Sequence, residues 1–491
     1  MSGLPARRAD GLPEPAAGDL LGHPRGVWML LAVTIGLNFA FYGFRAFLAP
    51  YAADTFFAGL TKADALKQAD LLLAGFGTLT YATAIIGGWI ADNVLGEAQA
   101  LRISLWATTL GLLGLAWPSR EGFTLALSFF VLAAGLGIPL TVLVGRNYAD
   151  DDPRRDAGYT LFYLAINLGA FVAPPVCAAW IGKRFGYDWG FVAAAAGMAV
   201  SALIFELRHR RIPGAADRPP LHRAWSTPAV LICTLALVWP CALLLAHPDA
   251  LHVAVYVLMA LMIVYFVVRS LLRGDAVQSQ RYLAMLLLFA AMVLFWAWSL
   301  QGATSLNFFA RDHVRAPFDY SWFQSANPLY ILVLAPALAA LWPWLDRRGL
   351  NPSTPMKFGI GLLLVALSYG AMVYAVRFLV GHDGRTPWWP LALCYLLSTL
   401  GELALSPIGY AMIGKLAAPE DASLAMGGWF FGVGVSYDLS GRIAAMTTHA
   451  DGNALAGYDH VFTMLLYSGI GIALVYLLTA PWIVKLMHGV K

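Results

Sequence analysis

Long apolar stretches separated by short polar loops run along the whole chain. A helix needs about 20 mainly apolar residues to cross the hydrocarbon core of a membrane, and about fourteen segments satisfy that requirement. We predict helices at 27–50, 70–91, 101–118, 123–146, 159–182, 189–207, 227–247, 250–271, 282–309, 321–345, 358–379, 388–415, 422–447 and 460–486. These segments are too long for barrel strands, so an all-α membrane protein is expected.

The segments fall into two blocks of six with a pair of helices between them. We predict a polar, disordered cytoplasmic tail at 1–25 and an N-terminal six-helix bundle at 26–207. A basic linker and two-helix insert follow at 208–279, and a C-terminal six-helix bundle occupies 280–491. The insert carries few polar groups and is expected to face lipid. Paired bundles around a midplane site are the usual architecture of secondary transporters.

Basic residues gather in alternate loops. RHRRIPGAADRPPLHR, at 208–223, is the most basic stretch, and DDPRRDAG lies at 151–158. Because Lys and Arg are enriched in cytoplasmic loops, both termini are predicted to be cytoplasmic. The expected location is the plasma (inner) membrane of a bacterium, crossed many times.

The composition of the chain excludes several classes of function. Hydrophobic residues make up 59% of the chain and charged residues 12%, whereas soluble proteins carry roughly 25% charged residues. The net charge of +4 does not indicate a nucleic-acid partner. The four cysteines have neither metal nor disulfide spacing. Phosphate-loop and H-E-x-x-H motifs are absent from the sequence, so we predict no enzyme activity, cofactor or metal.

One arginine interrupts the first apolar segment. Arg45 shares a helical stripe with Thr34, Asn38 and Tyr42, and Asp54, the nearest opposing charge in sequence, lies beyond the segment. A charge at a helix centre costs at least ~2.5–3.5 kcal/mol in a membrane. Arg45 therefore needs an anion or water, and the stripe is expected to face either a watery cavity or a helix interface.

A carboxylate stands alone in the segment 388–415. Glu402 lies in LGELALSPIG, with Ser406 one turn later and Pro407 next to it. Ionisable residues inside spans are candidates for function by default. Glu402 is a candidate partner of Arg45, and a substrate carboxylate is the other.

Two further polar pairs allow a structural and a functional interpretation. Tyr163 and Asn167 are four residues apart and share a helix face, which is also explained by a helix–helix hydrogen bond. Asp438 and Arg442 have the i, i+4 spacing of a local ion pair. If Asp438 faces a cavity instead, it is a second candidate proton site.

Several motifs in order resemble those of the proton-dependent oligopeptide transporters, a branch of the major facilitator superfamily. They include GHPRG, FYGFRA, DDPRRDAG, FYLAINLGAF, SWFQSANPL, PSTPMKF and LGELALSPIG. The resemblance is nearly full length. It implies a major facilitator fold with a peptide site between the two bundles, and the two-helix insert fits bacterial members.

The chain departs from this family at charged positions. The family usually carries E-x-x-E-R-F-x-Y-Y-G, but the aligned stretch TIGLNFAFYG has Thr34, Leu37 and Asn38 at the charged places. The family's lysine aligns with Gly137, and a family glutamate aligns with Leu300. The usual proton-coupling charges are therefore missing from these helices.

The resemblance implies a binding site with an intact amine end and a weakened carboxylate end. Asn167, Asn327 and Glu402 match the groups that hold a peptide amine, and Arg45 alone remains for the carboxylate. The matching cavity positions are Tyr42, Tyr81, Tyr163, Ser406 and Trp429.

We expect a transporter of di- and tripeptides or peptide-like amines that works by alternating access. Two versions stay open: a facilitator or exchanger without proton drive, or a carrier in which Glu402 or Asp438 binds the proton. The alternative function is a pseudo-transporter that serves as a structural or assembly subunit beside a membrane-protein partner.

Overall fold

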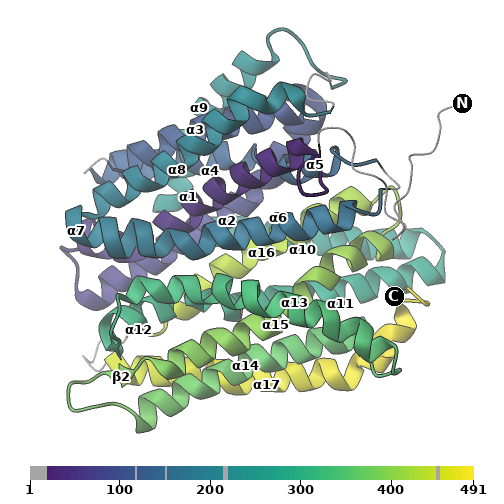
Figure 1. Ribbon diagram of the computed structural model, residues 1–491. Helices are drawn as coiled ribbons and strands as arrows, with labels where there is room; N and C mark the ends of the chain where they lie inside the picture. Colours follow the sequence, from purple (N-terminus) through teal and green to yellow (C-terminus); the bar gives the residue numbers. More distant parts are fainter. Residues whose placement is uncertain (1–18, 117–118, 150–151, 214–218, 449–453, 491) are drawn as a thin grey trace, which may run out of the picture.

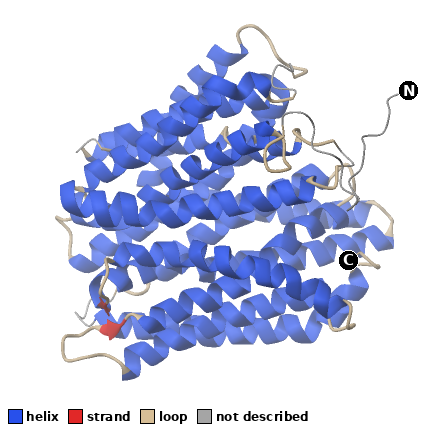
Figure 2. Ribbon diagram, in the orientation of Figure 1, coloured by secondary structure: helices blue, strands red, loops and turns tan. Residues whose placement is uncertain are grey.

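The structure is a computed structural model, and it describes residues 19–116, 119–149, 152–213, 219–448 and 454–490. Helices make up nearly all of this part (Figure 1, Figure 2). The N-terminal block contains α1 (Arg25–Thr55), α2 (Lys62–Ile90), α3 (Glu97–Leu115), α4 (Arg120–Gly135), α5 (Leu140–Gly145), α6 (Arg155–Pro174), α7 (Lys183–Phe185) and α8 (Tyr187–Arg208).

The insert and the C-terminal block follow. The insert consists of α9 (Ser226–Ala246) and α10 (Pro248–Leu272). The C-terminal block contains α11 (Ala276–Ser299), α12 (Ser305–His313), α13 (Ala326–Asp346), α14 (Thr354–Phe378), α15 (Trp389–Leu416), α16 (Ala422–Ala445) and α17 (Ala454–Leu486). Short 3-10 turns η4 (Leu300–Gly302) and η5 (Tyr320–Ser325) flank α12, and strands β1 (Val314–Arg315) and β2 (Thr386–Pro387) pair in parallel.

The all-α architecture predicted from hydropathy is confirmed. Within the described residues, eleven helical segments are long and apolar enough to cross a membrane. Helices α3, α15 and α16 supply further long segments, which matches the expected number of about fourteen. One predicted helix is broken: the segment 123–146 forms α4 and α5, with a turn between them. Pro139 at the start of α5 lacks the N–H that would continue the helix.

The two blocks lie one above the other, with α6 facing α13 across the middle of the view (Figure 1). Each block is centred on its own apolar cluster. Helices α2 and α16 cross between the blocks in close contact, because glycines line their interface. A Cβ atom at Gly441 would lie 2.3 Å from the Ala74 Cβ. This crossing brings Tyr437 on α16 beside α1 and α2.

The insert both faces outward and contacts the bundle. Leu235, Trp239 and Leu261 are exposed, as a lipid-facing pair requires. Its inner side is not purely apolar, however, because His252 on α10 donates a hydrogen bond of 2.6 Å to Asp438 on α16. The insert therefore has an exposed apolar side and a second side that contacts α16.

Most of the predicted tail at 1–25 lies outside the described residues. The part that is described, from residue 19, contacts the N-terminal block. Asp19 forms an ion pair of 2.7 Å with Arg154, and His23 Nδ1 lies 2.7 Å from the Tyr148 hydroxyl.

Candidate functional site

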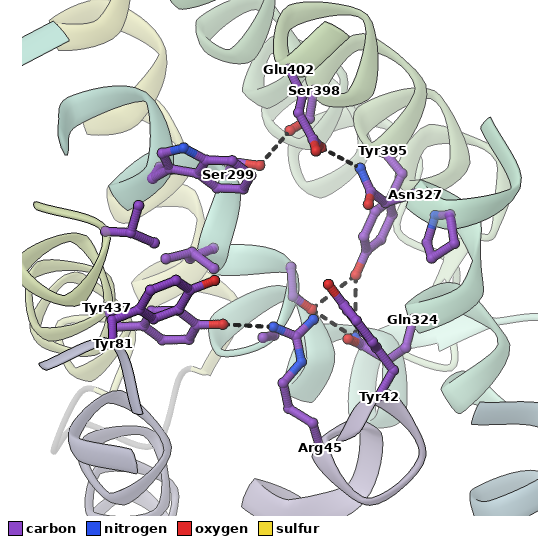
Figure 3. A pocket seen from close by; sticks show the side chains of 16 residues that line it. Tyr42, Arg45, Tyr81, Ser299, Gln324, Asn327, Tyr395, Ser398, Glu402 and Tyr437 are labelled. Carbon is purple, nitrogen blue, oxygen red and sulfur yellow. Dashed lines mark hydrogen bonds between the residues drawn. The ribbon is translucent and has the colours of Figure 1, made fainter. Parts of the chain in front are cut away.

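A cavity of about 110 Å³ lies between the two blocks (Figure 3). Its walls come from α1 and α2 on one side and from α11, η4, η5, α13, α15 and α16 on the other. The polar side chains that line it are Tyr42, Arg45, Tyr81, Ser299, Gln324, Asn327, Tyr395, Ser398, Glu402 and Tyr437. A site between two blocks changes shape whenever the blocks move relative to each other.

Arg45 occupies the N-terminal side of the cavity and has no ion-pair partner among the residues that the structure describes. Its Nη1 donates a hydrogen bond of 2.8 Å to the Tyr437 hydroxyl, and its guanidinium lies 4.8 Å from the centre of the Tyr42 ring. Among the described residues, no carboxylate lies within 4.0 Å of it. Glu402 is therefore not the partner of Arg45. A guanidinium has five N–H donors, so most of its capacity is available to an anion.

Glu402 lies on the opposite side of the same cavity, on α15. Only 9% of its surface is exposed, and it accepts a hydrogen bond of 2.8 Å from Asn327 Nδ2. Asn327 also donates to Thr399 Oγ1, which fixes the amide in place. In the described part of the chain, no cation lies within ion-pair distance of this carboxylate. A buried carboxylate with one neutral partner is a strong site for a cation, because its desolvation is not yet compensated.

Neutral polar groups complete the wall between these two charges. Gln324 Nε2 and the Tyr395 hydroxyl both donate to the Gly302 carbonyl, at 2.7 and 2.9 Å. Ser299 and Ser398 share a hydrogen bond of 3.1 Å beside Glu402. These residues escape sequence analysis because uncharged polar side chains are common in helices and only the fold reveals which way they face.

The structure brings together five of the predicted site residues and separates the others. Tyr42, Arg45, Tyr81, Asn327 and Glu402 line the cavity. Tyr163, Asn167, Trp429 and Asp438 are the other predicted residues whose side chains the structure describes, and none of them lines it.

Each residue outside the cavity has its own surroundings. Asn167 is buried on α6, and its Nδ2 donates to the Tyr163 carbonyl at 2.9 Å, within the same helix. Trp429 is buried between Phe289 and Phe358, with ring centres 5.8 and 6.4 Å away. The side chain of Ser406 lies outside the described residues.

Asp438 belongs to a charged cluster at the insert. It accepts the hydrogen bond from His252, and Arg442 Nε lies 3.4 Å from the same carboxylate at the i, i+4 spacing. Arg442 also reaches Asp249 at 3.1 Å. The local ion pair between Asp438 and Arg442 is present.

One buried carboxylate was missed by the sequence analysis. Asp70 on α2 is 1% exposed, and its Oδ1 accepts no hydrogen bond from any residue that the structure describes. It stands at the start of the predicted segment 70–91, where a polar residue is ordinary. The helix in fact begins at Lys62, so Asp70 lies two turns inside it.

Charged side chains join the blocks at the end of the bundle that holds β1, β2 and the α1–α2 connection. Figure 1 shows this end on the left, and α1 begins and α17 ends on the right. Three described ion pairs, here called the latch, join the blocks there at 3.1–3.2 Å: Lys62–Asp312, Asp54–Arg311 and Lys183–Asp319. The latch holds the two blocks together at this end of the cavity.

Two helical blocks that enclose a charged cavity are the architecture of a secondary transporter. The model of the POT family matches residues 107–460. The chain is 33% identical to the peptide transporter YePEPT of Yersinia enterocolitica, over 85% of this chain and 86% of that protein. It is 31% identical to the uncharacterized transporter YclF of Bacillus subtilis, over 96% of each.

The comparison with solved structures agrees with these sequence matches. A crystal structure of a mutant of peptide transporter POT in complex with alafosfalin matches with a TM-score of 0.82 and 30% identity, covering 96% of this chain and 97% of that chain. The chain therefore belongs to the POT family. It is an integral membrane transporter with the major facilitator fold and not an enzyme.

Proposed function

We propose that this transporter carries di- and tripeptides, or peptide-like solutes with a free amine, by alternating access in a bacterial plasma membrane. The observation that carries the proposal is the opposition of Glu402 and Arg45 across one cavity. A solute with a cationic end and an anionic or polar end complements both walls. The similarity to YePEPT and to the alafosfalin complex supports the same class of solute.

The amine end of the solute binds at Glu402. An ammonium group placed there gains an ion pair with a carboxylate that has only one neutral hydrogen-bond donor, Asn327. Ser398 and Ser299 offer hydroxyl oxygens beside it. Such a group satisfies the buried charge, which is why binding of an amine is favoured over binding of a neutral end.

The other end of the solute is held weakly. Arg45 is the one cation that lines this cavity in the described part of the chain, so an anionic end meets a single guanidinium, which also donates to Tyr437. Solutes in which the carboxylate is modified lose little, so amides and other peptide-like molecules remain substrates.

Coupling to protons, where it occurs, depends on Glu402. Burial disfavours the uncompensated charge of the carboxylate. The charge can be neutralised either by a proton or by the ammonium group of the solute. Asp438 is a weaker candidate, because His252 and Arg442 already compensate its charge. Without such coupling the protein is a facilitator or exchanger.

The latch supports an orientation. It closes the end of the bundle opposite the one where α1 begins and α17 ends. With both termini in the cytoplasm, as the basic loops indicate, the latch faces outward and solutes exchange with the cytoplasm.

The test is transport by proteoliposomes that contain the purified protein. Uptake of labelled di- and tripeptides is measured with and without an inward proton gradient, and counterflow is measured at equal pH. Accumulation driven by the gradient means proton coupling, and counterflow without accumulation means an uncoupled carrier. Absence of both signals across a broad peptide panel would overturn the proposal and favour the role of a structural subunit.

A further inference from the structure

A second, larger cavity lies inside the N-terminal block. It encloses about 230 Å³ and is lined by residues of α1, α2, α3, α4, α5, α6 and α8. Much of its wall is apolar, including Leu37, Phe41, Phe130, Ile166 and Met198. A dry cavity of about 150 Å³ already accepts benzene. This cavity therefore has room for an aromatic ring or a branched aliphatic group.

Three polar side chains of this wall donate hydrogen bonds within their own helices. Asn38 Nδ2, Thr80 Oγ1 and Thr108 Oγ1 each donate to the carbonyl four residues earlier, at 2.8, 2.7 and 2.6 Å. A charged side chain does not line this cavity in the described part of the chain. The wall consequently offers little to an ion or to a cluster of water molecules, and it favours an apolar occupant.

Adjacent residues of α1 line the two cavities. Phe41 lines the second cavity, and Tyr42 lines the cavity that contains Glu402. The Arg45 guanidinium lies 5.9 Å from the Phe41 ring and 4.8 Å from the Tyr42 ring. Ile138 and Thr141, which also line the second cavity, are exposed, so its mouth is open.

Three positions at which the family usually carries a charged residue line the second cavity. Leu37, Asn38 and Gly137 stand where charged residues were expected from the family resemblance, and all three line the second cavity. Short or apolar side chains at these positions leave the space unfilled.

We propose that the second cavity is a binding subsite for an aromatic or branched apolar group of the transported amine. The inference rests on the proposed function, because it assigns the apolar part of the same solute. The preferred solute then has a cationic amine at Glu402, an uncharged end and a bulky apolar substituent next to Phe41. Free peptides with small side chains are carried less well.

Binding of two neutral-ended probes tests the subsite. The purified protein in detergent is titrated with alanyl-phenylalanine amide and with alanyl-glycine amide, which share the amine and differ in the apolar group. The wild type is expected to bind the phenylalanine amide at least about tenfold more tightly, as a hydrophobic pocket discriminates. Ile166→Trp fills the cavity and should remove that preference while leaving the binding of alanyl-glycine amide unchanged.

Leu168→Trp is the matched control, because Leu168 lies on the same helix, is 43% exposed and does not line the cavity. It should keep the wild-type preference. Thr141→Trp, at the exposed mouth, provides a second filling variant should Ile166→Trp fail to fold.

Equal affinity of the wild type for both amides, or a preference that survives both filling variants, would overturn the subsite and leave peptide transport standing. Failure of both amides and of free dipeptides to bind would overturn the proposed function and the subsite together.

Discussion

Removal of the latch should shift the transporter toward the conformation that opens at the latch end. The triple substitution Asp54→Asn, Lys62→Gln and Lys183→Gln removes one partner from each of the three ion pairs. All three changes lie in the N-terminal block, and each replaces a charge by an uncharged polar group of similar size. The effect therefore comes from lost charge rather than lost packing.

The size of the shift follows from the exposure of the pairs. The substituted side chains are 63–72% exposed, while their partners in the C-terminal block are 15–18% exposed. Pairs of this kind contribute about 0.2–1 kcal/mol each because water screens them. The latch as a whole is then worth about 0.6–3 kcal/mol, which corresponds to a roughly 3- to 150-fold change in the ratio of the two conformations.

Distance measurements between spin labels detect this change. Labels at Gly59 and His382 report on the two sides of the latch, because both residues are exposed and lie in loops of different blocks. In the triple variant the population at long distance should grow by the stated factor. Salt at about 1 M should move the wild type in the same direction, because it screens exposed charges.

Arg102→Gln is the control, because it breaks the ion pair with Glu206 at 2.6 Å inside the N-terminal block. It should leave the distances unchanged. An unchanged distance distribution in the triple variant would refute the idea that the latch holds this end closed. An equal shift in Arg102→Gln would refute the assignment to cross-block charges.

Three further predictions concern buried and half-buried groups, each checked by thermal unfolding in detergent. Burial would raise the pKa of Asp421, but hydrogen bonds such as that from Tyr282 lower it below the ordinary carboxyl value. The ionised carboxylate therefore stabilises the fold above about pH 4. This contribution should disappear as the pH falls through the lowered pKa. In Asp421→Asn the unfolding midpoint should depend less on pH. Asp70→Asn should leave the midpoint unchanged or raise it, because it removes an ionisable group that is buried with an unsatisfied oxygen; a clear fall would contradict this. Tyr437→Phe should lower the free energy of unfolding by about 1.5–3 kcal/mol, the range for a hydrogen bond to a charged group. The same change releases Arg45, so it should increase the preference for free acids over peptide amides. An unchanged preference would argue against that release.

Hydropathy predicts the helices of this protein well and their ends less well. Helix α2 begins at Lys62 rather than at 70, because its first two turns carry Lys62, Asp64 and Lys67, which lower the local hydropathy. That difference hides Asp70, which the sequence places at a membrane boundary and the structure places in the interior. The ends of helices depend on packing and capping as well as on lipid.

The charged part of the site follows from the sequence, and its neutral part does not. Arg45 and Glu402 stand out because a charge in an apolar run is costly. Their actual partners, Tyr437 and Asn327, depend on how α16 and α13 are rotated against the other helices. Asn167 illustrates the limit, because the family resemblance implied a contact with the amine of the solute whereas its amide bonds within its own helix.

The proposed function depends on an ion pair between Glu402 and the amine of the solute. A carboxylate and an ammonium 4 Å apart attract each other by about 4 kcal/mol at the effective dielectric of a protein site. Losing one partner of such a pair costs about 2–4 kcal/mol. The decisive measurement is the affinity of wild type and Glu402→Gln for a dipeptide and for its N-acetylated form, which lacks the charge. We predict that Glu402→Gln weakens binding of the free dipeptide roughly 30- to 700-fold and leaves the N-acetylated form unaffected. Equal affinity of both proteins for the free dipeptide would contradict the account.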